Sequence, residues 1–166
     1  MIALQIRHIK DFMNKLLIQD TFDRFLVSEA SVTTFATFTV DGAFYPDFYA
    51  PEEAQGLRAS GRRQVLWKEI KPFCFSIIRG KRTPLSFKFV FQLPQEEVSL
   101  LTAKSSPDLS AEDVFGLYLN CSPCQYNGET LTLTTGSSLR LFTMDKSLDQ
   151  AWDKMLMEFL RLQDLD

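Results

Sequence analysis

Residues 85–93 alternate between apolar and mostly polar side chains, and this pattern constrains the fold more than any other feature of the sequence. Leu85, Leu93 and the three phenylalanines between them would lie on one side of an extended chain, which is the period of a strand with one buried face. Pro94 follows at once and suits the first turn of a helix, where its missing N–H is not needed. The pattern therefore predicts a strand that leads directly into a helix.

Apolar residues recur at helical spacing in four segments, and each segment predicts a helix with one buried face. The four expected helices cover residues 9–17, 66–77, 94–104 and 147–163. Pro72 must kink the second helix or begin a new one, because it lacks an N–H and clashes with the preceding turn. Gly80 fits a C-terminal cap for that helix, and Ser147 with Gln150 fits a capping box at the start of the last one.

Further strands are expected along the chain. Residues 1–6 predict a short strand, and the β-branched and aromatic density of residues 22–49 indicates two or three antiparallel strands with a type I′ hairpin turn at Asp41-Gly42. Residues 51–61 are polar and turn-prone, so we expect an exposed loop there. A meander of three more strands is expected at 114–120, 129–134 and 138–143, with turns at Asn127-Gly128 and Gly136-Ser137.

The composition suits one domain that spans residues 1–166. Hydrophobic residues make up 45% of the chain and aromatic residues 13%, enough to bury a core without disulfides or metals. We therefore expect an α+β fold of antiparallel sheet or paired sheets with about four helices. No apolar run approaches the roughly 20 residues that cross a bilayer, and charges near the start interrupt the apolar stretch of a signal peptide. The expectation is a cytoplasmic protein with reduced thiols and no membrane contact.

Residues 1–50 and 84–145 share a plan of strand, short helix and antiparallel strands, separated by a basic helical insert at 58–83 and followed by the C-terminal helix at 147–163. The shared plan suggests an internal duplication. A doubled arrangement of one strand, one helix and three strands resembles a single domain of the DNA polymerase sliding clamps. In those clamps the helices that face the central hole are basic, whereas the helix at 94–104 carries Glu96 and Glu97. The resemblance therefore implies architecture and not DNA encirclement.

The segment WKEIKPFCFSIIRGKRTPLSFKFVFQL, at residues 67–93, resembles a bacterial family of unknown function, as does the chain as a whole. The resemblance implies no activity, cofactor or ligand. Function has to be argued from the individual residues.

The net charge of −3 is unevenly distributed along the chain. Residues 58–88 hold nine basic residues against one acid, Glu69, so the rest of the chain carries −11. Cations that share one face would hold nucleic acid or an acidic protein, and Trp67 would either stack on a base or fill the core. The residues expected to form that face are Arg62, Arg63, Lys68, Lys71, Arg79, Lys81 and Arg82. The alternative is that acids elsewhere in the fold, or on a second copy, neutralise these cations.

Residues that could support catalysis or bind metal are few and isolated. Cys121 and Cys124 have the spacing of a redox motif, but the pair follows a strand and precedes a turn, so the helix dipole that would activate a thiol is absent. Zinc needs four ligands, and only Cys74 and His8 could join the pair. His8 has Asp11 on the next turn but no nucleophile beside it.

The remaining carboxylates in loops and at helix starts are explained by capping and solvation; they are Glu52, Glu53, Asp108, Glu112 and Asp113. No phosphate-binding glycine motif occurs in the sequence. We therefore expect no cofactor, no metal and no catalytic residue, and the sequence favours a non-enzymatic binding module. Two alternatives stay open: a small enzyme whose site forms only in three dimensions, and a structural subunit of a homo-oligomer.

Overall fold

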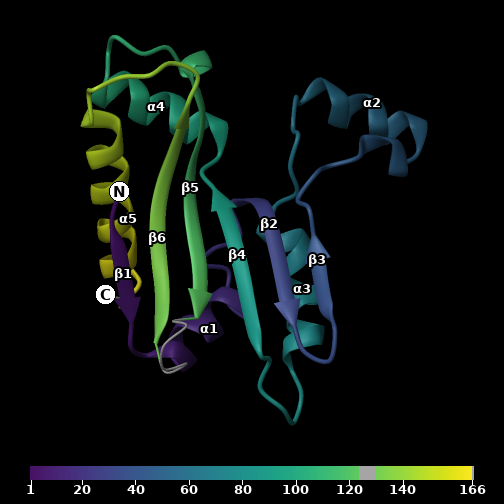
Figure 1. Cartoon of the computed structure of the whole chain (residues 1–166). Helices are drawn as coiled ribbons and strands as arrows, with labels where there is room; N and C mark the ends of the chain where they lie inside the picture. The colour runs from purple at the N-terminus through teal and green to yellow at the C-terminus, as the bar shows by residue number, and fades with distance from the viewer. Residues whose placement is uncertain (124–129, 166) are drawn as a thin grey trace.

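The computed structural model describes residues 1–123 and 130–165, which fold into one α+β domain (Figure 1). These residues form a six-stranded antiparallel sheet, five α-helices and two short 3₁₀ helices. The expected fold class is confirmed, and the four helices expected from the sequence are all present. The fifth helix, described below, was not expected.

The strands are β1 (Ala3–Ile6), β2 (Leu26–Thr33), β3 (Thr37–Val40), β4 (Ser86–Gln92), β5 (Val114–Pro123) and β6 (Leu131–Leu139). The helices are α1 (Ile9–Leu17), α2 (Pro51–Ala59), α3 (Trp67–Ile78), α4 (Gln95–Ser105) and α5 (Ser147–Leu162), with 3₁₀ helices η1 (Pro46–Phe48) and η2 (Ala111–Asp113).

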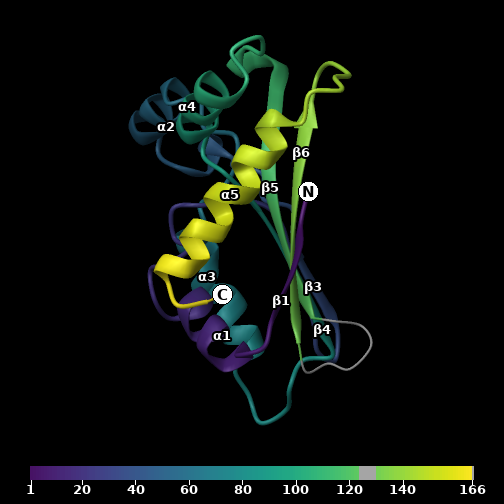
Figure 2. The same ribbon diagram turned by 90° about the vertical axis from the view of Figure 1, so that its left-hand side faces the viewer.

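The strands lie in the order β1-β6-β5-β4-β2-β3, each antiparallel to its neighbours. Figure 2 shows the described helices on one side of the sheet and none of them on the other. Strand alternation explains this arrangement, because Phe89 and Phe91 of β4 are buried beneath the helices while Lys88 is exposed on the open face. The open face carries small and polar side chains, among them Gln5, Ser31, Thr39, Asn120, Thr132 and Thr134.

An aromatic cluster fills the space between the sheet and the helices. The ring of Phe22 lies 5.9 Å from that of Phe91, and the fully buried Trp67 lies 5.1 Å from the rings of both Phe89 and Phe91. The Nε1 of Trp67 donates a hydrogen bond to the carbonyl oxygen of Leu16 at 2.7 Å, so the indole is buried with its polar atom paired. Trp67 is therefore a core residue and does not face a ligand.

Residues 51–61 do not form the expected loop, since Pro51–Ala59 is α2, which stands away from the sheet in Figure 1. Pro51 lies at the start of the helix, and Glu52 and Glu53 lie in the first turn, where the helix dipole favours carboxylates. Ala54 is the one buried residue of α2. A helix that buries a single small side chain leaves no apolar periodicity in the sequence.

The hairpin between β2 and β3 turns at residues 34–36, and not at Asp41-Gly42 as expected. Thr33 pairs with Thr37, and the Asp-Gly dipeptide follows the end of β3. Gly42 does have the positive φ, 77°, that its turn signal implied. A Cβ at this position would lie 2.1 Å from the carbonyl oxygen of Val27, so the glycine serves a close approach of two backbones.

The last part of the expected meander is also different, because the single strand β6 replaces the two strands expected at 129–134 and 138–143. Gly136 and Ser137 lie inside β6, where they pair with Tyr118 and Leu117 of β5, so they do not form a turn. Gly136 falls on the open face, where the strand needs no side chain for packing. The other expected turn, Asn127-Gly128, lies outside the described residues.

Two helix ends differ from expectation. After Ile78 the backbone becomes extended at Arg79, and Gly80 does not have the positive φ of a capping glycine; α3 itself runs through Pro72 as one helix. At the start of α5, the carboxylate of Asp145 accepts hydrogen bonds from the N–H of Ser147 at 2.9 Å and from its hydroxyl at 2.6 Å. Ser147 is thus a donor to Asp145, and its expected capping box with Gln150 is wrong.

The two parts of the chain that share a plan, residues 1–50 and 84–145, occupy the sheet differently. In the second part β4 pairs with β5, whereas in the first part β1 pairs with β6 and lies far from β2. The order of elements along the chain is shared, but the pairing is not. The duplication, and with it the sliding-clamp resemblance, stays a prediction.

Candidate binding surfaces

Arg62, near the N-terminal end of α3, is held by contacts within the domain. The Arg62 guanidinium lies over the ring of Phe44, 3.8 Å from its centroid, and forms an ion pair with Glu69 at 3.0 Å. Glu69 also accepts a hydrogen bond from the N–H of Leu66 at 2.8 Å, which satisfies a free donor at the start of the helix. Arg62 is therefore committed to contacts within the domain.

Lys71, in the middle of α3, is committed in the same way. Its ammonium lies 2.5 Å from a carboxylate oxygen of Asp23 and 2.9 Å from the carbonyl oxygen of Gln19. Two further ion pairs use cations of the basic segment, Arg58 with Asp47 and Lys88 with Glu29. Neutralisation by acids of the fold, the alternative left open by the sequence, thus applies to these cations.

The other five cations of the basic segment are exposed, and none forms an ion pair with the part of the chain that the structure describes. Arg63 and Lys68 lie near the N-terminal end of α3, whereas Arg79, Lys81 and Arg82 follow its C-terminal end. A helix of 12 residues separates the two groups by about 18 Å of rise. The seven residues singled out from the sequence are therefore divided between two places, and only three of them share one loop.

That loop lies beside the hairpin turn of β2 and β3. The N–H of Leu85 donates a hydrogen bond to the carbonyl oxygen of Thr33 at 2.8 Å, which fixes the connection from α3 to β4 next to the turn. Figure 1 shows both segments at the same end of the sheet. We call residues 79–85 and 33–38 together the cationic tip.

The cationic tip combines three cations that form no ion pair with a described residue and exposed apolar side chains. Phe35 is 93% exposed and Leu85 80% exposed, and the ring of Phe35 lies 5.8 Å from that of Phe38. Neither segment of the tip contains an acidic residue. Such exposure of large apolar groups beside cations is typical of a contact surface.

Sequence reasoning missed the apolar part of the tip. Leu85 continues the alternation of β4 but precedes the strand, so its side chain is not buried. Phe35 lies in a stretch of β-branched and aromatic residues whose turn has no glycine, proline or asparagine to mark it. A turn at residues 34–36 would have placed Phe35 outside the strands, but the sequence offers the stronger turn signal at Gly42 instead.

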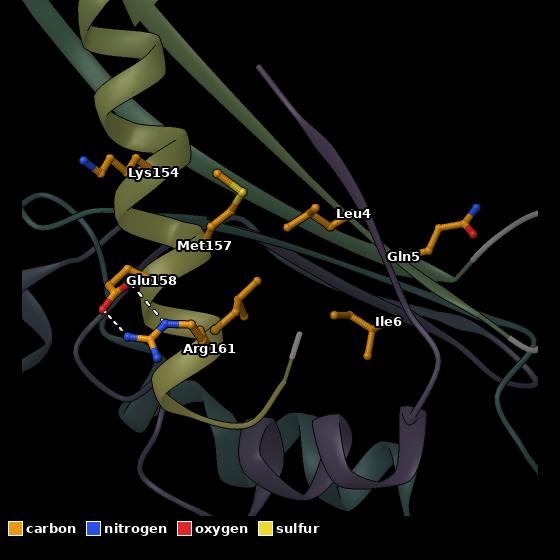
Figure 3. Close-up of a pocket in the computed structure, with 8 residues that line it drawn as sticks. Leu4, Gln5, Ile6, Lys154, Met157, Glu158 and Arg161 are labelled. Carbon is orange, nitrogen blue, oxygen red and sulfur yellow. Dashed lines mark hydrogen bonds and ion pairs between the residues drawn. The ribbon is translucent and has the colours of Figure 1, made fainter.

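A second surface is a groove of about 410 Å³ between β1 and α5 (Figure 3). Its apolar lining comes from Leu4 and Ile6 of β1 and from Met157 and Leu160 of α5. Gln5 of β1 and three charged residues of α5, namely Lys154, Glu158 and Arg161, complete the lining. Hydrogen bonds from Arg161 lower the pKa of the Glu158 carboxyl, so this exposed pair stays charged. We call this cavity the edge groove.

An adjoining cavity of about 420 Å³ contains the single histidine of the chain. It shares Gln5 and Ile6 with the edge groove and adds Arg7, His8, Asp164 and Leu165. The lining includes no serine, threonine, cysteine or lysine that could act as a nucleophile. No group of three or more potential metal ligands occurs within residues 1–123 and 130–165.

The cysteines that the structure describes are buried. Burial raises the pKa of the Cys74 thiol to about 11 and raises that of Cys121, inside β5, still further, so both stay protonated near neutral pH. Because Cys121 is buried in a strand of the core, its thiol is expected to be unreactive. Cys124, its partner in the redox-motif spacing, lies outside the described residues.

Comparison with known families agrees with the sequence resemblance. A family of unknown function, DUF5721, matches residues 15–166, which includes the cationic tip and all of α5. The chain belongs to this family. No curated protein and no solved structure matches the chain. Among the described helices, none has the length and apolar character needed to cross a membrane.

Proposed function

We propose that this domain is a non-enzymatic binding module that holds single-stranded nucleic acid on the cationic tip. The observation that carries the proposal is that Arg79, Lys81 and Arg82, which pair with no acid among the described residues, lie on the connection that is hydrogen-bonded beside the hairpin turn of the almost fully exposed Phe35. Single-strand binding proteins combine these two elements, because cations follow the phosphates while aromatic rings stack on the bases. We also propose that the protein is cytoplasmic, because single-stranded nucleic acid occurs in that compartment.

The exposed ring favours nucleic acid over an acidic protein as the ligand. A patch that served only to attract carboxylates would gain nothing from Phe35, which costs free energy when it is left in water. Stacking on a base is worth about 1–3 kcal/mol and removes one face of the exposed ring from water. Phe38, 5.8 Å away, is 38% exposed and could extend the platform to a second base.

The experiment measures the binding of a fluorescein-labelled oligothymidylate of about 12 nucleotides by fluorescence anisotropy at several salt concentrations. Wild-type protein should bind with an affinity that falls with salt, with a logarithmic slope of about −2 if three phosphates are contacted. Charge reversal at Arg79, Lys81 and Arg82 should abolish binding. A matched control reverses Lys10, Lys104 and Lys154, which are exposed elsewhere and change the net charge equally.

Phe35→Ala tests the stacking element separately. It should weaken oligonucleotide binding about tenfold without changing the salt dependence, because the phosphate contacts remain. Equal loss in the tip and control variants would show that net charge alone governs binding and would reject the proposed site. Binding of polyglutamate in place of the oligonucleotide would favour an acidic protein as the ligand.

A further inference from the structure

The open edge of β1 exposes backbone groups that a further strand could pair with. The carbonyl oxygen of Ile2 accepts a hydrogen bond from the N–H of Thr135 of β6 at 3.1 Å. The backbone N–H and C=O groups of successive residues in an antiparallel strand point alternately to its two edges. Those of Leu4 and Ile6 therefore also point to β6, in register with Leu133 and Leu131. The N–H and C=O groups of Ala3 and Gln5 therefore point to the unpaired edge.

The groove on the helix side of that edge is lined by apolar side chains, against which the side chains of an added strand could pack. Figure 3 shows Leu4 and Ile6 pointing toward α5, with Met157 pointing back at Leu4, while Gln5 points away. Met157 is 45% exposed although it lies among buried residues of α5. An added strand would cover this methionine with those of its side chains that face the helices.

The charged residues around the edge groove and the adjoining cavity favour an acidic occupant. Three cations, Arg7, Lys154 and Arg161, stand against two carboxylates, Glu158 and Asp164. This local excess of positive charge occurs in the part of the chain that is otherwise strongly acidic. Arg7 and Lys154 are exposed and form no ion pair with described residues, so an acidic segment could pair with either.

We infer that the edge groove binds an extended segment of another protein, which adds to β1 as a seventh strand. Its backbone pairs with Ala3 and Gln5, its alternate apolar side chains cover Leu4, Ile6 and Met157, and acidic residues flank the apolar ones. Pairing of this kind takes affinity from the main chain and specificity from alternate side chains. The inference is independent of nucleic-acid binding at the cationic tip, which lies at the other side of the sheet order.

A second copy of the chain fits the groove less well than a peptide does. Both views place α5 behind the β1 edge, in the layer beneath the position of an added strand. A second β1 would bring its own α5 into that layer, where α5 already lies. A lone extended segment brings no such helix.

The probe is a seven-residue peptide with blocked ends, Glu-Leu-Thr-Val-Thr-Ile-Glu, in which the three apolar residues share one face. Binding to ¹⁵N-labelled protein is followed by NMR. The expected result is a saturable shift of the Ala3 and Gln5 amide signals together with slower hydrogen exchange at both. Two N-methylated peptides provide the discriminating control, one methylated on the odd residues and one on the even residues. Only one of them should bind, because only one set of N–H groups faces β1.

Two protein variants test the groove without disturbing the core. Met157→Lys should weaken peptide binding about tenfold or more, because it places a charge on the apolar floor. The matched control is Leu162→Lys, which is also on α5 and 66% exposed but does not line the groove. Gln5→Pro should abolish binding with little loss of sheet pairing, because it removes an N–H that points to the open edge.

The outcomes divide clearly. Peptide binding that depends on one methylation pattern, on Met157 and on Gln5 supports the inference. Equal binding of both methylated peptides, or no binding of the unmodified peptide at millimolar concentration, overturns it. Light scattering on the unliganded protein adds one further test, since a dimer that Met157→Lys dissociates would mean that a second copy fills the groove and would overturn the peptide assignment.

Discussion

Near the N-terminal end of α3, Arg62 is held between the ring of Phe44 and the carboxylate of Glu69. At the C-terminal end, Arg79, Lys81 and Arg82 extend into solvent from a connection that has no acid near it in the sequence. The two ends belong to one basic segment and hold similar numbers of cations. They differ in what the fold brings to them.

The difference teaches that charge along the chain becomes surface charge only where the fold supplies no partner. The N-terminal end of α3 enters the core through Trp67, and there Arg62 meets Glu69 of the same helix. Farther along the helix, Lys71 meets Asp23 of the segment before β2. The C-terminal end leads into a connection whose neighbours, residues 33–38, contain no charged residue. The first end should therefore matter for stability and the second for binding.

The largest effect should come from Trp67→Ala at the buried end of α3. Removing the indole leaves a cavity among Phe89 and Phe91 and an unpaired carbonyl on Leu16, which should lower the free energy of unfolding by about 3–5 kcal/mol. Phe73→Ala, on the same helix but 67% exposed, should change it by less than about 0.5 kcal/mol. Urea denaturation followed by circular dichroism measures both, and equal losses would contradict the assignment of Trp67 to the core.

The next largest effect contrasts Gly42, which precedes the basic segment, with Gly80, which lies within it. Gly42→Ala should destabilise the domain by about 2–4 kcal/mol, because a Cβ would strike the backbone of Val27 and the positive φ would be strained. Gly80→Ala meets nothing within 4 Å and should leave stability unchanged or slightly higher. Thermal unfolding compares the two, and a neutral Gly42→Ala would show that the close approach to β2 is not required.

Much of the fold could be predicted because its strongest patterns have a single structural meaning. The alternation of β4 and the apolar stripe of α5 each bury one face, and both elements lie close to where the sequence places them. Two misses have a common cause. The turn signals at Gly42 and Gly136 mark backbone features other than hairpin turns, and a short sequence window cannot distinguish a turn from a close approach or from a bare position on an open face.

The candidate sites could be predicted less well, because they depend on which segments meet in space. Nothing in the sequence places the hairpin turn after Thr33 beside the connection before Ser86, since that proximity comes from the pairing of β2 with β4. The edge groove depends on β1 pairing with β6, a contact between the two ends of the chain. Two of the seven residues expected to bind a ligand, Arg62 and Lys71, instead form ion pairs within the domain. The partner of Lys71, Asp23, comes from a segment far away in the sequence.

A smaller difference in the free energy of unfolding is expected between variants of Glu69 and of its neighbour Lys68. Glu69→Ala removes both the acceptor for the Leu66 N–H and the partner of Arg62, and should cost about 1–2 kcal/mol. Lys68→Ala changes an exposed cation with no ion pair among residues 1–123 and 130–165, and should cost less than about 0.5 kcal/mol. Chemical denaturation of the pair decides whether the N-terminal end of α3 depends on its acid, and indistinguishable values would argue that it does not.

The smallest effect on stability should accompany the largest effect on binding. Replacing Arg79, Lys81 and Arg82 together by alanine should change the free energy of unfolding by less than about 0.5 kcal/mol, because no described carboxylate loses an ion-pair partner and all three side chains are exposed. The same variant should lower oligonucleotide affinity about tenfold or more. Within residues 1–123 and 130–165 these three mutually repelling cations have no ion-pair partner, so the proposed site predicts that their contribution is made when an anion binds. If this variant lost stability but kept its affinity, the cations after the C-terminal end of α3 would stabilise the fold as Arg62 does at the other end. The contrast between the two ends would then be wrong.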